Sequence, residues 1–142
     1  MYQVNVEKIE QHLTYLEKVL SYIAPVVQNE QRTEEGLAML ALERALHIAL
    51  ETVADVGNYL IDGFIMRDPG SYEDIVDILE DETVIVPDMA VALRHVVNAR
   101  KMLVTTYTDV DSQTVKTMLQ AHFTYLQQFP EAVREYLKKE LF

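Results

Sequence analysis

The chain has 142 residues, a formal net charge of -11, four glycines, four prolines and no cysteine. The length suits one domain covering residues 1–142, and the scarcity of turn residues favours an all-α fold, an antiparallel bundle of about five to six helices. The absence of cysteine excludes disulfides and thiolate metal sites, and the acidic charge opposes non-specific attraction to nucleic acid, so that we expect no DNA partner.

The N-terminal sequence MYQVNVEKIEQ carries charge where a secretory signal would need an apolar core, and every apolar run is interrupted before it could span a bilayer. We therefore expect a cytoplasmic protein without membrane contact. From Val6 to Val27, apolar residues recur at alternating steps of three and four, which predicts a helix with one narrow apolar stripe. Because Pro25 lies inside this pattern, the last turn is kinked or the helix ends near Ile23. The polar residues 29–35 form the turn that follows.

The stretch from Gly36 to Met66 predicts one long helix, because it contains no proline and consists mostly of good helix formers. Its apolar residues cover well over half of the helix circumference, so that neighbouring helices must surround it. The remaining arc holds the strongly polar residues Glu43, Arg44, His47, Glu51, Asp55, Asn58 and Asp62. This polar strip is either exposed to solvent or faces a shared polar cleft.

The second half of the chain predicts shorter elements. The breaker cluster 67–70 ends the long helix, and Ser71 with Asp74 predicts the capped start of a short helix that closes in the acidic run 80–82. Pro87 suits the first position of the next helix, which extends to Tyr107. We expect the last two helices to span residues 112–128 and to begin again at Pro130.

On the helical wheel of residues 87–107, Arg100 falls in the middle of the apolar arc. A guanidinium cannot be deprotonated, so such a residue needs an anion or a route to water. One interpretation is that Arg100 pairs with Glu51 or Asp55 and fixes how two helices register. The other is that it is presented to a phosphate inside a cleft.

The segments ALERALHIALETVADVGNYLI, SYEDIVDILEDETVI and NARKMLVTTYTDVD resemble the HepT-like family of the HEPN superfamily, and the resemblance covers nearly the whole chain. The family signature is an arginine, four residues, a histidine, one residue and a tyrosine, usually followed by an acidic turn. Arg100 matches the arginine, Tyr107 the tyrosine, and Asp109 and Asp111 the acidic turn. The histidine position holds Thr105.

The resemblance implies an all-α homodimer that acts as the ribonuclease toxin of a toxin–antitoxin pair, with a MntA-like nucleotidyltransferase as antitoxin. In this family, arginine and histidine meet at the dimer cleft and cleave RNA without a metal. The histidine moves protons during attack by the ribose 2′-hydroxyl, and the arginine steadies the charge on phosphorus. Arg100 and Thr105 would then occupy the catalytic positions. Tyr107 would be the site of adenylate attachment by the partner, or else an ordinary core or rim tyrosine.

Thr105 departs from the family signature at the position of the histidine. A hydroxyl cannot titrate near neutral pH, and losing a general acid-base group lowers the rate by ~100- to 10,000-fold. His47, on the polar strip, is a better substitute than His95. On an ideal helix, residues five apart diverge by more than a right angle. For Arg100 and Thr105 to share a site, the helix must end or bend near Val104, which the β-branched run there favours, or opposite subunits must contribute.

The residues Glu43, His47, Glu51 and Asp55 recur at four-residue steps, as metal ligands could. Ferritin-like bundles instead place Glu and His three residues apart on paired helices, and no second such pair exists here. We therefore expect no metal and no cofactor, and interpret the four residues as a hydrated cleft wall in which Glu43 contacts His47.

Two functions follow from the sequence. The first is a HepT-like ribonuclease toxin component whose cleavage is weakened or lost. The second is a non-catalytic homodimeric interaction protein that binds a nucleotidyltransferase or RNA.

Overall fold

A computed structural model describes residues 2–31 and 35–142, and within these ranges it contains five α-helices and no strand. The elements are α1 (Val6–Gln28), α2 (Gly36–Gly63), α3 (Tyr72–Asp81), α4 (Pro87–Asn98), the π-helical turn η1 (Lys101–Thr105), the 3₁₀ turn η2 (Tyr107–Asp109) and α5 (Ser112–Leu141). The prediction of an all-α fold is confirmed. The polar turn expected over residues 29–35 lies partly outside the described residues.

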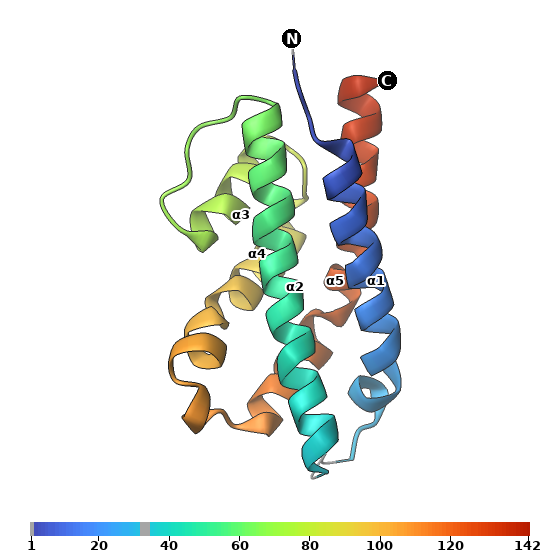
Figure 1. The fold of residues 1–142 in the computed structure, drawn as a ribbon, viewed down its shortest axis with the longest axis vertical. Helices are drawn as coiled ribbons and strands as arrows, with labels where there is room; N and C mark the ends of the chain where they lie inside the picture. Colours follow the sequence, from blue (N-terminus) through green and yellow to red (C-terminus); the bar gives the residue numbers. More distant parts are fainter. Residues whose placement is uncertain (1, 32–34) are drawn as a thin grey trace.

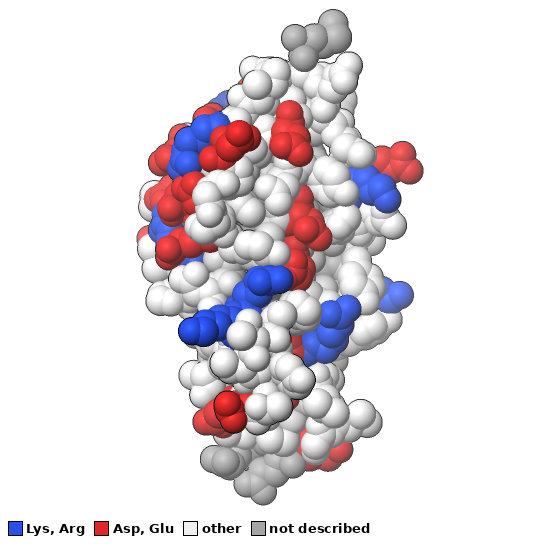
Figure 2. All heavy atoms as spheres, turned by 60° about the vertical axis from the view of Figure 1, so that its left-hand side comes forward, with Lys and Arg blue, Asp and Glu red and all other residues white. Residues whose placement is uncertain are grey.

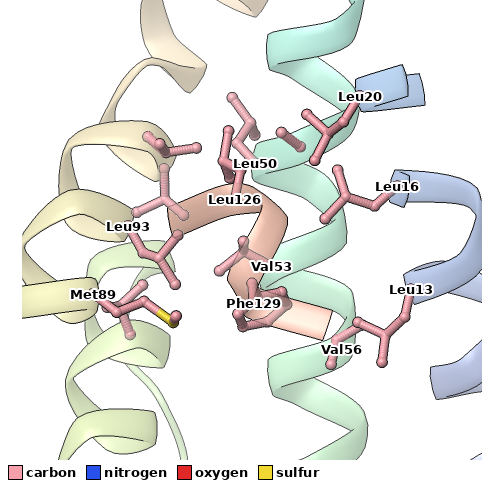
Figure 3. Packing of buried hydrophobic residues seen from close by; sticks show 14 of the residues in the cluster. Leu13, Leu16, Leu20, Leu50, Val53, Val56, Met89, Leu93, Leu126 and Phe129 are labelled. Atoms are coloured by element: carbon pink, nitrogen blue, oxygen red, sulfur yellow. The ribbon is translucent and has the colours of Figure 1, made fainter. Parts of the chain in front are cut away.

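The long helices α1, α2 and α5 pack against one another, and α3 and α4 lie together to one side of them (Figure 1). The start of α1 and the end of α5 lie at the same end of the bundle, as the antiparallel arrangement requires. In the middle, the four helices α1, α2, α4 and α5 contribute apolar side chains to a common core (Figure 3). Ten of its members are Leu13, Leu16, Leu20, Leu50, Val53, Val56, Met89, Leu93, Leu126 and Phe129.

One of the two alternatives for Pro25, a helix end near Ile23, is wrong, and so is the predicted start of a helix at Pro130. The first helix does not stop near Ile23, since α1 passes through Pro25 and ends at Gln28. Likewise Pro130 does not begin a separate helix, because α5 continues through it. Proline removes one helical hydrogen bond and crowds the preceding turn. Here the apolar stripe of α5 is buried on both sides of Pro130, and this packing outweighs the local cost. Figure 1 shows that α5 changes direction along its length.

Gly57 allows α3 to lie against α2. A Cβ atom at this position would lie 2.3 Å from Cγ2 of Ile75 and 3.6 Å from Cδ1 of Leu79, both on α3. Any larger residue would therefore push the two helices apart. The glycine thus sets the depth at which α3 sits, and α3 begins with Tyr72, a residue of the site described below.

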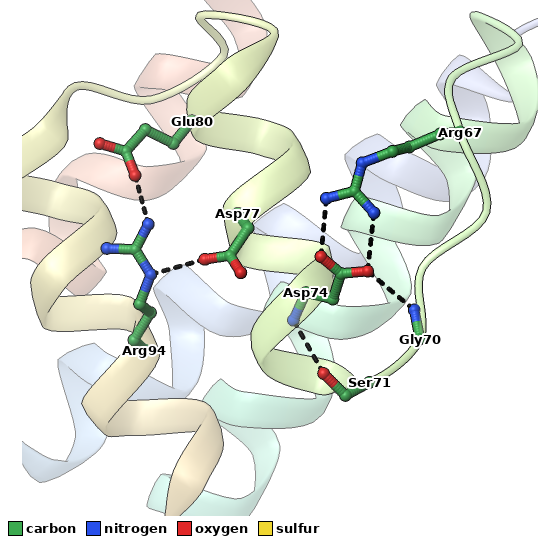
Figure 4. Close-up of polar contacts among 7 residues, drawn as sticks. All are labelled: Arg67, Gly70, Ser71, Asp74, Asp77, Glu80 and Arg94. Atoms are coloured by element: carbon green, nitrogen blue, oxygen red, sulfur yellow. Dashed lines mark hydrogen bonds and ion pairs between the residues drawn. The ribbon is translucent and has the colours of Figure 1, made fainter.

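Ion pairs hold both ends of α3 (Figure 4). Near its C-terminal end, Arg94 of α4 donates to Asp77 and to Glu80. At its start, Asp74 accepts two hydrogen bonds from Arg67, at 2.8 and 2.7 Å, and one from the backbone of Gly70. These donors, first Arg67 and then Gly70, lower the pKa of Asp74 to about 2.

The predicted caps of α3 and α4 are also present. The Ser71 hydroxyl accepts a hydrogen bond from the backbone N–H of Asp74 at 3.0 Å, as expected for an N-cap. Pro87 is the first residue of α4, where its missing N–H costs nothing. The start of α3 is therefore anchored by a cap and an ion pair together.

Candidate functional site

Arg100 lies at the surface, beyond the end of α4. The expectation that it falls in the middle of an apolar helical face is wrong, because α4 ends at Asn98 and the chain changes its winding from Lys101 onward. The buried face of α4 ends near Val97 and Ala99. The Arg100 side chain is 45% exposed, so that the guanidinium has its route to water.

The turn after Arg100 is π-helical, from Lys101 to Thr105. Its defining bond runs from the Thr106 N–H to the Lys101 carbonyl at 3.0 Å, a spacing of five residues. In such a wide turn, residues five apart are one turn apart along the axis instead of on diverging faces. Arg100 and Thr105 have this spacing. The helix thus departs from α geometry near Val104, which is one of the two conditions under which Arg100 and Thr105 could share a site, and single π-turns are frequent at functional sites.

Glu51 of α2 is the anion beside Arg100. The Arg100 Nε donates to Glu51 Oε1 at 3.1 Å, and the Tyr72 hydroxyl donates to the other carboxylate oxygen at 3.0 Å. The Arg100 guanidinium also lies over the Tyr72 ring, 5.0 Å from its centroid, an arrangement that favours the cation. Residues from α2, the start of α3 and the end of α4 therefore meet at one carboxylate.

The charges of this group follow from its contacts. The hydrogen bond to Glu51, and next the electrostatic effect of Tyr72, raise the pKa of Arg100, which stays a cation throughout the physiological range. Burial, and next the hydrogen bond to Glu51, raise the pKa of Tyr72, so that its hydroxyl stays protonated and keeps donating. The site holds a fixed cation, half exposed, whose only carboxylate contact within the described ranges is at Nε.

The polar strip of α2 divides into two groups. His47 belongs to the Arg100 group, because its Nε2 lies 3.6 Å from Glu51 Oε1. Asp55 turns to α1 instead, where its Oδ2 lies 3.6 Å from Nε2 of His12. Burial is the main cause that raises the pKa of Asp55. His47 makes polar contacts with Glu51 and with Arg44. Its expected partner, Glu43, is a half-buried residue one turn earlier on α2.

The segment after the π-turn is exposed. Thr105 is exposed, and Tyr107, at the start of η2, is 66% exposed. Of the two residues in the predicted acidic turn, Asp111 has a structural use. Its carboxylate accepts from the backbone N–H of Gln113 at 3.0 Å and so caps α5. Asp109 closes η2 through its backbone N–H, which donates to the Thr106 carbonyl.

Sequence reasoning missed Tyr72, and it placed Arg44 on the polar strip without predicting the contact of Arg44 with His47. Tyr72 directly follows the N-cap of α3, and its chain separation of 21 residues from Glu51 has no periodicity that could have suggested the contact. Arg44 is three residues before His47 on α2, so that the helical spacing did contain a signal for their contact at 3.2 Å.

The described residues contain no group of three or more His, Cys, Asp and Glu side chains placed to hold a metal ion. Nor does any helix in the described ranges combine the length and apolar character needed to cross a membrane. The net charge is acidic, but Figure 2 shows a face on which basic side chains lie near the middle, below a region where acidic and basic groups alternate. A local basic contact is thus compatible with the overall charge.

The sequence and the fold were compared with those of known proteins. The sequence matches the family described as Ribonuclease HepT-like over residues 12–133. A curated relative in Bacillus subtilis (strain 168), named "Putative RNase YutE", is 43% identical over 141 residues, which cover 99% of this chain and 95% of the relative. The solved structure of YutE, described as a cytosolic protein of unknown function, has a TM-score of 0.91 at 41% identity, covering 99% of this chain and 96% of that one.

More distant solved structures share the fold. One, described as a toxin–antitoxin with AMP-PNP, has a TM-score of 0.79 at 17% identity, covering 89% of this chain and 97% of that one. Another, a tri-AMPylated Shewanella oneidensis HEPN toxin in complex with its MNT antitoxin, has a TM-score of 0.74 at 18% identity, covering 95% and 99%. Since the family match spans most of the sequence, the chain belongs to the HepT-like ribonuclease family.

Proposed function

We propose that this protein is the ribonuclease component of a toxin–antitoxin module, that residues 1–142 act as one domain, and that it cleaves RNA slowly and without a metal. The observation that carries the proposal is Arg100, a cation held at the surface by Glu51 and Tyr72 and still 45% exposed. A guanidinium in this position can contact a phosphate and stabilise the charge that develops on it. The YutE name gives the same activity for a relative 43% identical.

We further propose that two copies of the chain meet near Arg100, so that RNA lies across a cleft between them. Apolar surface beside the arginine is uncovered, since Val104 is 37% exposed and Tyr107 is 66% exposed. A partner subunit would bury such side chains with a favourable free energy. The predicted result in solution is a dimer that substitution of Val104 by aspartate dissociates, as measured by sedimentation.

The proposed antitoxin is a MntA-like nucleotidyltransferase that attaches adenylate groups to the Tyr107 hydroxyl. The exposure of Tyr107 on a short turn makes the hydroxyl accessible, and the toxin in the Shewanella complex is AMPylated. We assign the pair to the cytoplasm, in line with the description of YutE as cytosolic. Incubation with the nucleotidyltransferase and ATP should add adenylate mass to the wild type and none to Tyr107→Phe.

The activity is tested on an RNA substrate in the presence of a chelator. We expect slow cleavage by the wild type, loss of cleavage in Arg100→Ala, and a gain of ~100-fold or more in Thr105→His, which places an imidazole on the π-turn. The matched control is Lys101→Ala, which removes the neighbouring exposed cation and should retain cleavage. If neither the wild type nor Thr105→His cuts RNA, the ribonuclease function is refuted.

Two observations favour the second candidate, a non-catalytic homodimeric interaction protein. Thr105 cannot move protons at neutral pH, and Glu51 already neutralises part of the Arg100 charge. Such a protein would bind the nucleotidyltransferase or RNA through the same surface without cutting it. Retained RNA binding that Arg100→Ala weakens, with no cleavage by the wild type, would identify this case.

A further inference from the structure

His47 shares one carboxylate oxygen with Arg100. Glu51 Oε1 lies 3.1 Å from Arg100 Nε and 3.6 Å from His47 Nε2, so that the two nitrogens are at most 6.7 Å apart. This limit applies to Nε2, the ring nitrogen that faces Glu51, and it places the imidazole ring close to the guanidinium. The imidazole of α2 and the guanidinium after α4 thus form one cluster, although 53 positions of sequence separate them.

The contact with Arg44 indicates which tautomer a neutral His47 ring adopts. The Arg44 Nη1 lies 3.2 Å from His47 Nδ1, and because a guanidinium only donates, Nδ1 must be the acceptor. The proton of the neutral ring is therefore on Nε2, facing Glu51. A cation on one side and an anion on the other orient the ring, while 31% of the side chain is exposed to solvent.

The other three histidines of the chain have different surroundings. His12 pairs with Asp55 and lies edge-on to Tyr59, with ring centroids 5.6 Å apart. His95 and His122 stack on each other, with centroids 5.4 Å apart and rings 8° from parallel. Within the described ranges, His47 is thus the histidine that shares a partner with Arg100.

We propose that His47 transfers the proton that Thr105 cannot, and that Glu51 is a positioning residue for both His47 and Arg100. This inference rests on the proposed ribonuclease function. The 2′-oxygen of the ribose forms a bond to phosphorus as the bond from phosphorus to the 5′-oxygen breaks. His47 accepts the 2′-hydroxyl proton and returns it, directly or through a water molecule, to the departing 5′-oxygen, which leaves a 2′,3′-cyclic phosphate and a 5′-hydroxyl with no net change in protons.

Arg100 stabilises the charge on the phosphoryl oxygens during this step. Arg44 is exposed on the same face, where an RNA phosphate would compete for its guanidinium and uncover Nδ1 of the imidazole. The groups that face His47 are thus Arg44, Glu51 and, through Glu51, Arg100 and Tyr72. Arg44 and Arg100 contact phosphate groups, whereas Glu51 and its partner Tyr72 orient neighbouring side chains.

The test compares His47→Gln with His95→Gln as the matched control, in the full-length chain and on the same RNA. We expect His47→Gln to lower kcat by ~100-fold or more, with little change in KM. His95→Gln should behave as the wild type. Adding Thr105→His to His47→Gln should restore cleavage, which would also show that the His47→Gln substitution is compatible with the active fold.

The outcomes separate the two ideas. If the wild type cuts RNA, Arg100→Ala does not and His47→Gln cuts as well as His95→Gln, the ribonuclease function stands and the role of His47 is wrong. If only proteins that contain Thr105→His cut RNA, His47 contributes no proton transfer and the inference again fails. If no variant cuts RNA, the ribonuclease function fails, and the role of His47 fails with it.

Discussion

Substitution of Gly57 by alanine is expected to destabilise the fold through a single clash. The added Cβ would lie 2.3 Å from Cγ2 of Ile75, about 1.1 Å closer than the 3.4 Å at which ordinary contact begins. Ile75 is 3% exposed and packs with Ile61 and Ile78, and its branched Cβ leaves few rotamers. Overpacking of this kind costs ~1–3 kcal/mol, whereas alanine gains ~0.5–1 kcal/mol over glycine inside a helix. We therefore expect a net loss of about 0.5–2 kcal/mol in the free energy of unfolding.

A double-mutant cycle with Ile75 tests this prediction directly. Ile75→Ala removes the clashing methyl group, so that Gly57→Ala should become stabilising by ~0.5–1 kcal/mol in that background. The assay is urea unfolding followed by circular dichroism. Gly36→Ala is the control, since a Cβ there meets nothing within 4 Å. An equal effect of Gly57→Ala in both backgrounds would refute the argument from close helix approach.

Three other predictions concern charge and backbone strain. The pKa of Asp74 is lowered to about 2 by Arg67, so its ionised form stabilises the fold above about pH 4, and this contribution is lost as the pH falls toward 2. The difference in urea midpoint between the wild type and Asp74→Asn should shrink over that window; a constant difference would contradict it. Ile65 has φ 57° at the end of α2 and is 76% exposed, so Ile65→Gly should raise the free energy of unfolding by ~0.5–1 kcal/mol, and a loss would show that the side chain is needed. Glu51→Gln removes a negative charge beside the site's guanidinium and should tighten RNA binding by roughly three- to tenfold in anisotropy titrations while lowering kcat. Asp55→Asn, the same charge change one turn away, should have a smaller effect.

The regular parts of the fold could be predicted because their signals are local. The apolar stripes of α1 and α2 follow helical periodicity, and the cap at Ser71 and the start at Pro87 depend on residues next to the helix ends. The continuation of α5 through Pro130 could not be predicted in this way. It depends on burial of the helix against distant segments, which the proline rule does not include.

The candidate site shows the same division. Contact of Arg100 with Glu51 was one of two pairings expected from charge, because a buried or half-buried cation needs an anion. Its position at the surface was not predicted, since a helical wheel assumes uniform winding and the chain leaves α geometry at Lys101. The Tyr72 contact depends on how deeply α3 packs on α2, and therefore on Gly57, a purely three-dimensional effect.

Because of the π-turn, the number of residues between Arg100 and Tyr107 determines how these two side chains are oriented relative to each other at the surface. Removing one residue from the segment Lys101–Thr105 would let an ordinary α-turn form there. Everything that follows, including the Tyr107 hydroxyl, would then rotate by roughly 100° about the helix axis relative to Arg100. A one-residue deletion could thus separate the cation from the tyrosine without altering either side chain, whereas most substitutions in the same segment would leave their relative orientation intact.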